Sequence, residues 1–250
     1  MYKKIPKTHF VGQTIKVLPS CPSTNSYIAQ KLQKGQLKNG EVIITDNQTE
    51  GRGQRGNVWE SENGKNLTFS IGIFDLELPI TEQFRLHFIT SLAIIKTINE
   101  NTLAKASIKW PNDIFIGDKK VAGILIENNI RKNEIYSSII GIGLNVNQLL
   151  FETNHATSLA LETYQEHHKD EILRSFLENF EHFIFRKEDK KSLEELYLKN
   201  SFRLNTIAKF KDDNGNFKGI IRGLNTEGML LIEKEGKIIS YNFKEVAYIL

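Results

Sequence analysis

The spacing of hydrophobic positions along this 250-residue chain changes several times, and each spacing predicts a different kind of element. Apolar residues recur about every 3.6 residues over residues 82–100, which predicts an amphipathic helix. Three further helices are predicted, over residues 24–34, 168–186 and 190–199.

Short apolar runs bounded by turn signals predict strands over residues 41–45, 67–73, 107–110, 113–116, 120–127 and 136–146. Gly117-Asp118 stands between two of these runs and suits a tight hairpin turn. Hairpins join antiparallel strands, whereas parallel pairs need long crossovers. The predicted fold class is therefore α+β, with a mixed, mainly antiparallel sheet and helices on one face.

The pattern changes after Asn200. From Thr206 onward, short alternating apolar runs are separated by turn dipeptides such as Asn214-Gly215 and Glu235-Gly236, which is typical of half-buried strands. We therefore predict two domains, residues 1–200 and a small all-β domain at residues 201–250. The second is too small to have a large core and should dock on the first.

Composition limits the possible functions. Hydrophobic residues make up 40% and charged residues 25%, as in ordinary globular proteins. The net charge of +3 comes without a stripe of Lys or Arg, so DNA binding is not expected. No run approaches the roughly 20 apolar residues of a membrane span. The single cysteine, Cys21, has no partner for an intrachain disulfide, so we expect a reducing, cytoplasmic location.

The first segment with candidate chemistry is Gly51-Arg52-Gly53-Gln54-Arg55-Gly56. Glycines let the backbone approach a ligand closely, and guanidinium groups suit carboxylates and phosphates. The spacing matches neither a P-loop nor a dinucleotide-binding fingerprint. From the residues alone, a flexible surface loop is an equally good interpretation.

A second segment is Lys109-Trp110-Pro111-Asn112-Asp113, followed by Lys120 directly before Val121-Ala122-Gly123. The Trp-Pro pair restricts the backbone ahead of an amide and a carboxylate. The small residues after Lys120 would let a substrate lie against the strand. A plain hairpin with surface lysines is the alternative.

Two more segments are less specific. Gly141-Ile142-Gly143-Leu144-Asn145-Val146-Asn147 reads as an apolar strand, and Asn145 could pair with an adenine edge. Ser23-Thr24-Asn25-Ser26 places hydroxyls and an amide at a helix start, where they suit a small polar head group. Ordinary strand packing and helix capping explain both segments as well.

Taken together and in this order, STN, GRGQRGNVW, KWPND, KKVAG and GIGLNVN resemble the biotin–protein ligase family. The resemblance is strong over roughly residues 20–160. The C-terminal segment is similar to the small SH3-like barrel that these enzymes carry, and the resemblance implies a class II synthetase-like catalytic domain. Since only about 20 residues precede STN, we expect a monofunctional type without an N-terminal DNA-binding domain.

The resemblance implies a two-step reaction. Biotin is activated with ATP to biotinyl-5′-AMP, with Mg²⁺ as activator, and biotin is then transferred to a lysine of a biotin carboxyl carrier domain of a carboxylase. It implies no DNA or membrane partner, and an exposed sheet edge would allow a homodimer. Metal ligands are not specified.

By position, the resemblance assigns roles to particular residues. Lys120, Arg52 and Asp113 would be catalytic, with Lys120 between the biotin carboxylate and the phosphate. Biotin would be bound by Ser23, Thr24, Asn25, Gln48, Arg52, Gly53, Gln54, Lys120 and Gly123. ATP or the adenylate would be bound by Arg52, Arg55, Asn112, Lys120 and Asn145. Trp59 would either pack the loop over the ligand or belong to the core.

One position departs from the family pattern, because Gln54 stands where arginine is usual. The change removes a charge, which bears on how tightly the adenylate is retained. Two rival functions are disfavoured. A lipoate or octanoyl transferase would have a histidine near its Gly-rich motif, whereas the nearest here are His9 and His87. A biotin-sensing regulator would need a helix-turn-helix ahead of STN.

Overall fold

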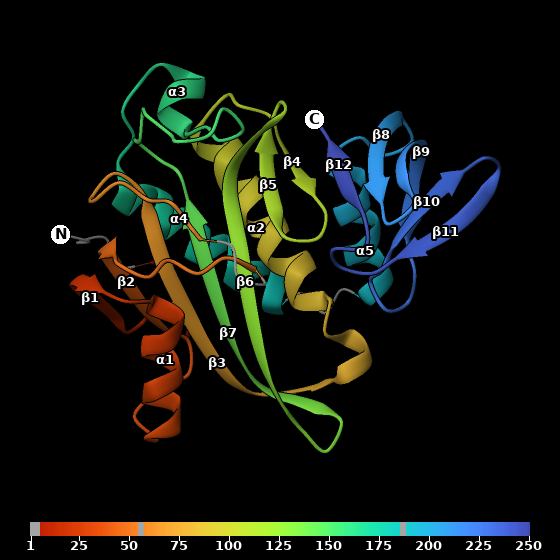
Figure 1. Cartoon of the computed structure of the whole chain (residues 1–250). Helices are drawn as coiled ribbons and strands as arrows, with labels where there is room; N and C mark the ends of the chain where they lie inside the picture. The colour runs from red at the N-terminus through yellow and green to blue at the C-terminus, as the bar shows by residue number, and fades with distance from the viewer. Residues whose placement is uncertain (1–5, 55–57, 186–188) are drawn as a thin grey trace.

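A computed structural model describes residues 6–54, 58–185 and 189–250. Within these ranges, seven strands form the main sheet in the order β1-β2-β3-β7-β6-β5-β4 (Figure 1). The strands are β1 (Ile15–Cys21), β2 (Glu41–Gln48), β3 (Leu67–Pro79), β4 (Ala106–Lys109), β5 (Asp113–Ile116), β6 (Lys119–Arg131) and β7 (Glu134–Leu144). The helices are α1 (Thr24–Gln33), α2 (Arg85–Asn101), α3 (Leu159–Thr163), α4 (Lys169–Phe185) and α5 (Lys190–Lys199), with a 3₁₀ turn, η2 (Ile80–Glu82).

Pairing in the main sheet is mainly antiparallel, which confirms the predicted fold class at that level. The long strands β3, β7 and β6 form its centre, and β6 joins β7 through a turn at Lys132 and Asn133, both with positive φ. Only β1 and β2 pair in parallel among the described strands, and α1 is their crossover. The predicted hairpin at Gly117-Asp118 joins β5 to β6.

The prediction that the helices cover one face is wrong for α1. Successive side chains of a strand point to opposite faces, and in β2 Val42 and Ile44 belong to the core beneath α2 and α4, whereas Ile43 packs with Ile28 of α1 on the other side. The sheet therefore has two faces to bury. The longer helices α2 and α4 cover one, and the short α1 covers part of the other.

The structure contains two elements that the hydrophobic pattern did not predict, β1 and α3. It also extends the predicted strands at 67–73 and 120–127 to Pro79 and Arg131. In the first extension Phe74, Leu76 and Leu78 alternate with polar residues and pack against the core, a continuation of the pattern that the prediction missed. The second runs through polar or exposed positions, and pairing with β7 maintains it.

The C-terminal residues form a second, antiparallel sheet in the order β11-β10-β9-β8-β12. Its strands are β8 (Ile207–Asp212), β9 (Gly215–Leu224), β10 (Leu230–Lys234), β11 (Lys237–Tyr241) and β12 (Ala247–Ile249). It lies beside α2 and α5 (Figure 1). Trp110 Nε1 donates to Gly228 O at 2.9 Å, and the Phe84 ring lies 5.9 Å from that of Phe243. No helix in the described ranges is long and apolar enough to cross a membrane.

Candidate active site

One cleft of about 400 Å³ gathers most of the residues selected from the sequence. It lies over β6 and β7 and is bordered by the start of α1, the Gly-rich loop, the β4–β5 turn and the end of the C-terminal sheet. The predicted residues that line it are Ser23, Thr24, Asn25, Gln48, Arg52, Gly53, Gln54, Asn112, Asp113, Lys120 and Gly123.

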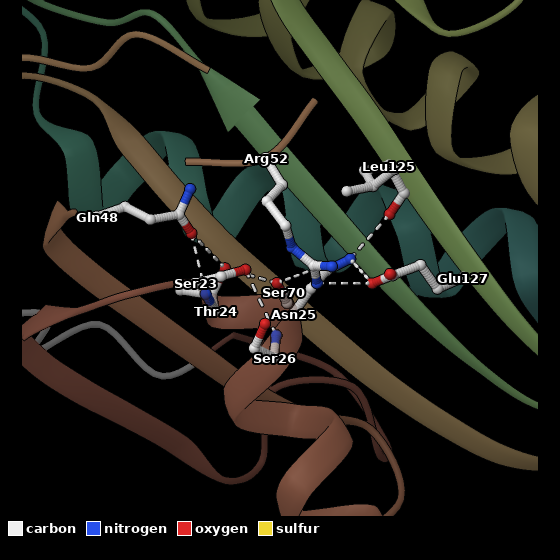
Figure 2. A network of polar contacts seen from close by, with 9 residues as sticks. All are labelled: Ser23, Thr24, Asn25, Ser26, Gln48, Arg52, Ser70, Leu125 and Glu127. Carbon is white, nitrogen blue, oxygen red and sulfur yellow. Dashed lines mark hydrogen bonds and ion pairs between the residues drawn. The ribbon is translucent and has the colours of Figure 1, made fainter. Parts of the chain in front are cut away.

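The α1 end of the cleft is a neutral polar pocket (Figure 2). Ser23 caps α1, since its side chain accepts from Ser26 N. Gln48 Oε1 accepts from Thr24 N at 2.9 Å, and Ser70 Oγ lies 2.7 Å from Thr24 Oγ1. Helix capping and cleft lining thus coincide in this segment, so the capping interpretation is confirmed and binding of a polar head group stays a prediction.

Asn25 extends this pocket toward a carboxylate. Its side chain accepts from Ser70 Oγ at 2.5 Å and donates to Glu127 Oε2 at 2.6 Å. Arg52 also reaches Glu127, with Nη2 at 3.4 Å from Oε2 (Figure 2). Neither Ser70 nor Glu127 was predicted as a site residue, because each stands in a strand without a neighbouring motif.

The Gly-rich loop folds back on itself. Trp59 N donates to Gly51 O at 3.0 Å, and Arg52 pairs with Val58 in an isolated antiparallel bridge. A Cβ on Gly51 would overlap the Trp59 carbonyl oxygen, so this position requires glycine. Arg55 lies outside the described residues.

Trp59 lies inside the cleft, on a floor made of two glycines. A Cβ on Gly143 would overlap its indole ring, and one on Gly123 would come within 3.1 Å of it. Lys120 Nζ lies 5.5 Å from the centre of the indole, within the range of a cation–π contact. The small residues of KKVAG and GIGLN thus provide a flat surface on which an aromatic ring can lie.

The opposite end of the cleft is cationic. Lys120 Nζ lies 2.6 Å from Asp113 Oδ1, and Lys109 Nζ lies 3.9 Å from Asp113 Oδ2. Burial lowers the pKa of Lys109, whereas Asp113 raises it and Lys120 lowers it again. One carboxylate therefore balances two ammonium groups, which leaves a net positive charge to attract an anion.

The β4–β5 turn is rigidly held around this charge cluster. The side chain of Asn112 donates through Nδ2 to Ile124 O at 2.8 Å, and the backbone carbonyl of Asn112 accepts from Ile124 N at 2.9 Å. The Trp110–Pro111 peptide bond is cis. Asn112 therefore fastens the turn to β6, which places Asp113 beside Lys120.

The C-terminal sheet closes one side of the cleft. Lys244, Val246, Ala247 and Tyr248 line it, and the ammonium of Lys109 lies 5.0 Å from the Tyr248 ring centre. Sequence reasoning missed these residues, because no local pattern marks where two distant segments meet.

Asn145 does not line this cleft. It is buried behind Lys120, where its Nδ2 donates to Thr157 O at 2.9 Å. Its Oδ1 has no hydrogen-bond partner among the described residues.

The cleft on this mainly antiparallel sheet has a neutral polar end and a cationic end, which together suit a ligand that carries both a polar ring and an anionic group. The family model described as "Biotin/lipoate A/B protein ligase family" matches residues 17–145, and the chain belongs to this family.

Individual relatives agree. The chain is 29% identical to the "Bifunctional ligase/repressor BirA" of Bacillus subtilis, over 91% of this chain and 71% of the relative. It is 24% identical to the "Biotin--[acetyl-CoA-carboxylase] ligase" of Mycobacterium tuberculosis, over 94% and 89%. Among solved structures, the biotin protein ligase from Aquifex aeolicus in complex with biotin and ATP superimposes with a TM-score of 0.78 at 27% identity, covering 94% of this chain and 98% of that one.

Proposed function

We propose that the chain is a biotin–protein ligase, which activates biotin with ATP to biotinyl-5′-AMP, releasing pyrophosphate, and transfers biotin to a lysine of a biotin carboxyl carrier domain, releasing AMP. The observation that carries the proposal is the polarity of the cleft. Its neutral hydroxyl and amide end suits the ureido ring of biotin, and its cationic end suits a carboxylate and a phosphate.

The two ends of the cleft have different roles in the reaction. Ser23, Thr24, Asn25 and Gln48 offer neutral donors and acceptors, which can bind a ureido ring without burying a charge. At the other end Lys120 stabilises the negative charge that grows as the carboxylate attacks the α-phosphate. Cations fixed before the reaction are effective because they need no reorganisation during it.

Arg52 would move during the cycle. Its guanidinium pairs with Glu127, and both groups are about half exposed, so this ion pair is weak. A biotin carboxylate or α-phosphate could displace it, since Arg52 also lines the cleft. Gly53 and Gln54 would contact the same groups, and Arg55 would add positive charge.

ATP would bring Mg²⁺ with it. No group of three His, Cys, Asp or Glu side chains in the described ranges is placed to hold a metal ion, and Asp113 is engaged by Lys120. The phosphates and water would therefore supply most of the ligands for Mg²⁺, which usually keeps several waters when it is bound to a nucleotide. Asn112 would hold the turn at the phosphate end. For Asn145 we propose contact with the adenine amino group, supported by its unpaired Oδ1 acceptor.

The proposal extends to the C-terminal domain, the oligomeric state and the cellular location. Residues 201–250 would form a separate small domain with an SH3-like barrel, consistent with their five-stranded antiparallel sheet. The exposed edge strand β1 offers a surface for a homodimer, and a single buried cysteine suits the cytoplasm.

The decisive experiment supplies the purified protein with ATP, Mg²⁺ and either biotin, lipoate or octanoate, together with a biotin carrier domain and a lipoyl domain. We expect that biotin, and neither lipoate nor octanoate, adds its mass to one lysine of the biotin carrier domain. Labelling of the lipoyl domain by lipoate or octanoate, without biotin transfer, would contradict the assignment.

A further inference from the structure

Glu127 is the only carboxylate among the nine residues of Figure 2. We propose that it is a positioning residue, which fixes the direction of the hydrogen bonds that run from Asn25 through Ser70 to Thr24 and so keeps this side of the pocket ordered for its ligand. This inference rests on the proposed function, because it concerns how the same pocket binds its ligand.

The first step is the orientation of the Asn25 amide. Its Nδ2 lies 2.6 Å from Glu127 Oε2 and 3.4 Å from Leu125 O. A carboxylate and a carbonyl only accept hydrogen bonds, so the amino group must face them and Oδ1 must face Ser70. Oδ1 lies against Gly141, where a Cβ would overlap it, so the glycine makes room for the amide in this position. The partners therefore determine which way this amide points, which X-ray data often leave open.

The second step passes this direction along the network. Because Asn25 Oδ1 accepts from Ser70, the single hydroxyl proton of Ser70 is used, and Ser70 Oγ can only accept from Thr24. Thr24 in turn gives its proton to Ser70 or to Gln48 Oε1, which lies 3.3 Å from its hydroxyl oxygen.

The third step identifies what remains for a ligand. Gln48 Oε1 already accepts from Thr24 N, so the amino group of Gln48 is left to donate. The Ser23 hydroxyl oxygen caps α1, so its proton is also left to donate. These two donors suit a ring carbonyl, and the backbone N–H groups of Thr24 and Ser26 set them. What Glu127 adds is the order of Asn25, Ser70 and the Thr24 hydroxyl beside them.

The same carboxylate also contacts Arg52, but the bond to Asn25 is the stronger one. Asn25 is buried and its donor lies 2.6 Å from the carboxylate, whereas the Arg52 pair is 3.4 Å apart and about half exposed. Charge-assisted hydrogen bonds strengthen with short distance and burial, and exposed ion pairs contribute little. Replacing Glu127 should therefore act mainly through Asn25.

The test compares Glu127→Gln with the wild type and with Glu134→Gln, an exposed carboxylate at the start of β7. Adenylation is measured over a range of biotin concentrations. A glutamine can donate as well as accept, so Asn25 can turn over and the hydrogen bonds of Ser70 and Thr24 lose their fixed direction. We expect the KM for biotin to rise about ten-fold in Glu127→Gln, with kcat within about two-fold because the reacting end of the cleft is unchanged. Glu134→Gln should behave as the wild type.

A double-mutant cycle separates the two contacts of Glu127. In an Asn25→Ala background, Glu127→Gln should cause no further rise in the KM for biotin if it acts through Asn25. Additive effects on KM, or an unchanged KM in the single variant, would overturn the proposal.

A readout without any ligand keeps this test independent of the proposed function. The side-chain amide protons of Asn25, followed by ¹⁵N-edited NMR, should exchange slowly with solvent in the wild type and faster in Glu127→Gln. Equal exchange in the two proteins would overturn the role of Glu127. A wild type that orders Asn25 but does not adenylate biotin would overturn the function and leave the positioning role intact.

Discussion

Lys120 Nζ lies 2.6 Å from Asp113 Oδ1, so the ammonium expected to stabilise the developing charge is held by a carboxylate across the β5–β6 hairpin. The two residues come from different motifs, KWPND and KKVAG, and strand pairing brings them together. Asp113 thus orients the lysine, while Lys109 keeps the cluster positive overall.

The first prediction concerns Lys120→Ala. Loss of a fixed charge at the reacting carboxylate should lower the rate of adenylate formation by on the order of 100-fold or more. Biotin-dependent pyrophosphate exchange measures this step directly. Lys119→Ala, which removes the exposed neighbouring lysine, is the matched control and should retain activity. Near-normal exchange in Lys120→Ala would refute the role assigned to this residue.

A second prediction uses the pKa of Lys109. Its pKa is already lowered by burial, and Asp113 is the group that raises it. Asp113→Asn should therefore lower this pKa further, so that Lys109 loses its proton at a lower pH than in the wild type. We expect the alkaline limb of the pH profile of kcat/KM for ATP to shift to lower pH. Asp118→Asn, which removes a mostly exposed carboxylate at the same hairpin, should leave the profile unchanged.

The third prediction compares the effect of an added methyl group at Gly143 and at Gly123, the two glycines beneath Trp59. A methyl group on Gly143 would overlap the Trp59 indole, whereas one on Gly123 would stand 3.1 Å from it. Gly143→Ala should lower the free energy of unfolding by about 1–3 kcal/mol, as overpacking does, and should change the tryptophan fluorescence. Gly123→Ala should cause a smaller change in both. The reverse order, measured by urea unfolding, would contradict the placement of Trp59.

A fourth prediction is that replacing Gln54 with arginine improves retention of the adenylate. Gln54 lines the cleft where the family usually has arginine. Gln54→Arg should add a charge-assisted hydrogen bond to the adenylate and slow its release by roughly ten-fold or more. Release is measured by chasing preformed labelled adenylate with an excess of unlabelled biotin. Gln165→Arg, at an exposed position, adds the same charge elsewhere and should not alter the release rate.

The final prediction concerns stability in acid. Burial lowers the pKa of His87 to about 4, and its ring stacks on Phe84 beside Phe243 of the C-terminal segment. The folded protein therefore keeps His87 neutral while the unfolded chain protonates near pH 6.5. Stability should fall as the pH drops from about 6.5 to 4, by up to roughly 1.4 kcal/mol per pH unit from this group. His87→Phe should flatten that dependence in urea titrations, whereas His155→Asn, at an exposed position, should not.

Local patterns predicted the elements of the fold well. The 3.6-residue spacing located α2, the helix predicted over 168–186 corresponds to α4, and the hairpin at Gly117-Asp118 implied the antiparallel pairing around Lys120. Strand β1 was not predicted, because Pro19 interrupts it and most of its side chains are not buried. Such a strand is tolerated at the sheet edge, where an absent N–H costs nothing. Its parallel pairing depends on the return of the chain through α1, which alternation does not encode.

The site was predictable where a motif concentrates it. The Gly-rich loop, KWPND and Lys120 converge on one cleft as expected. The rest depends on contacts between distant segments. In the sequence, Ser70 and Glu127 are ordinary strand residues, and their role is visible only in the fold, where both bond to Asn25. Likewise, Lys244 and Tyr248 reach the cleft only because the second sheet packs there.

The hydrogen bond from Trp110 Nε1 to Gly228 O joins the charged turn to a loop of the C-terminal sheet. Trp110 stands directly beside Lys109 and three residues from Asp113, so this bond ties the charged turn to the C-terminal sheet. Asn112 fastens the same turn to β6. The turn that carries the charges is therefore anchored on both sides, and a sheet that contains none of the sequence motifs contributes to the shape of the site.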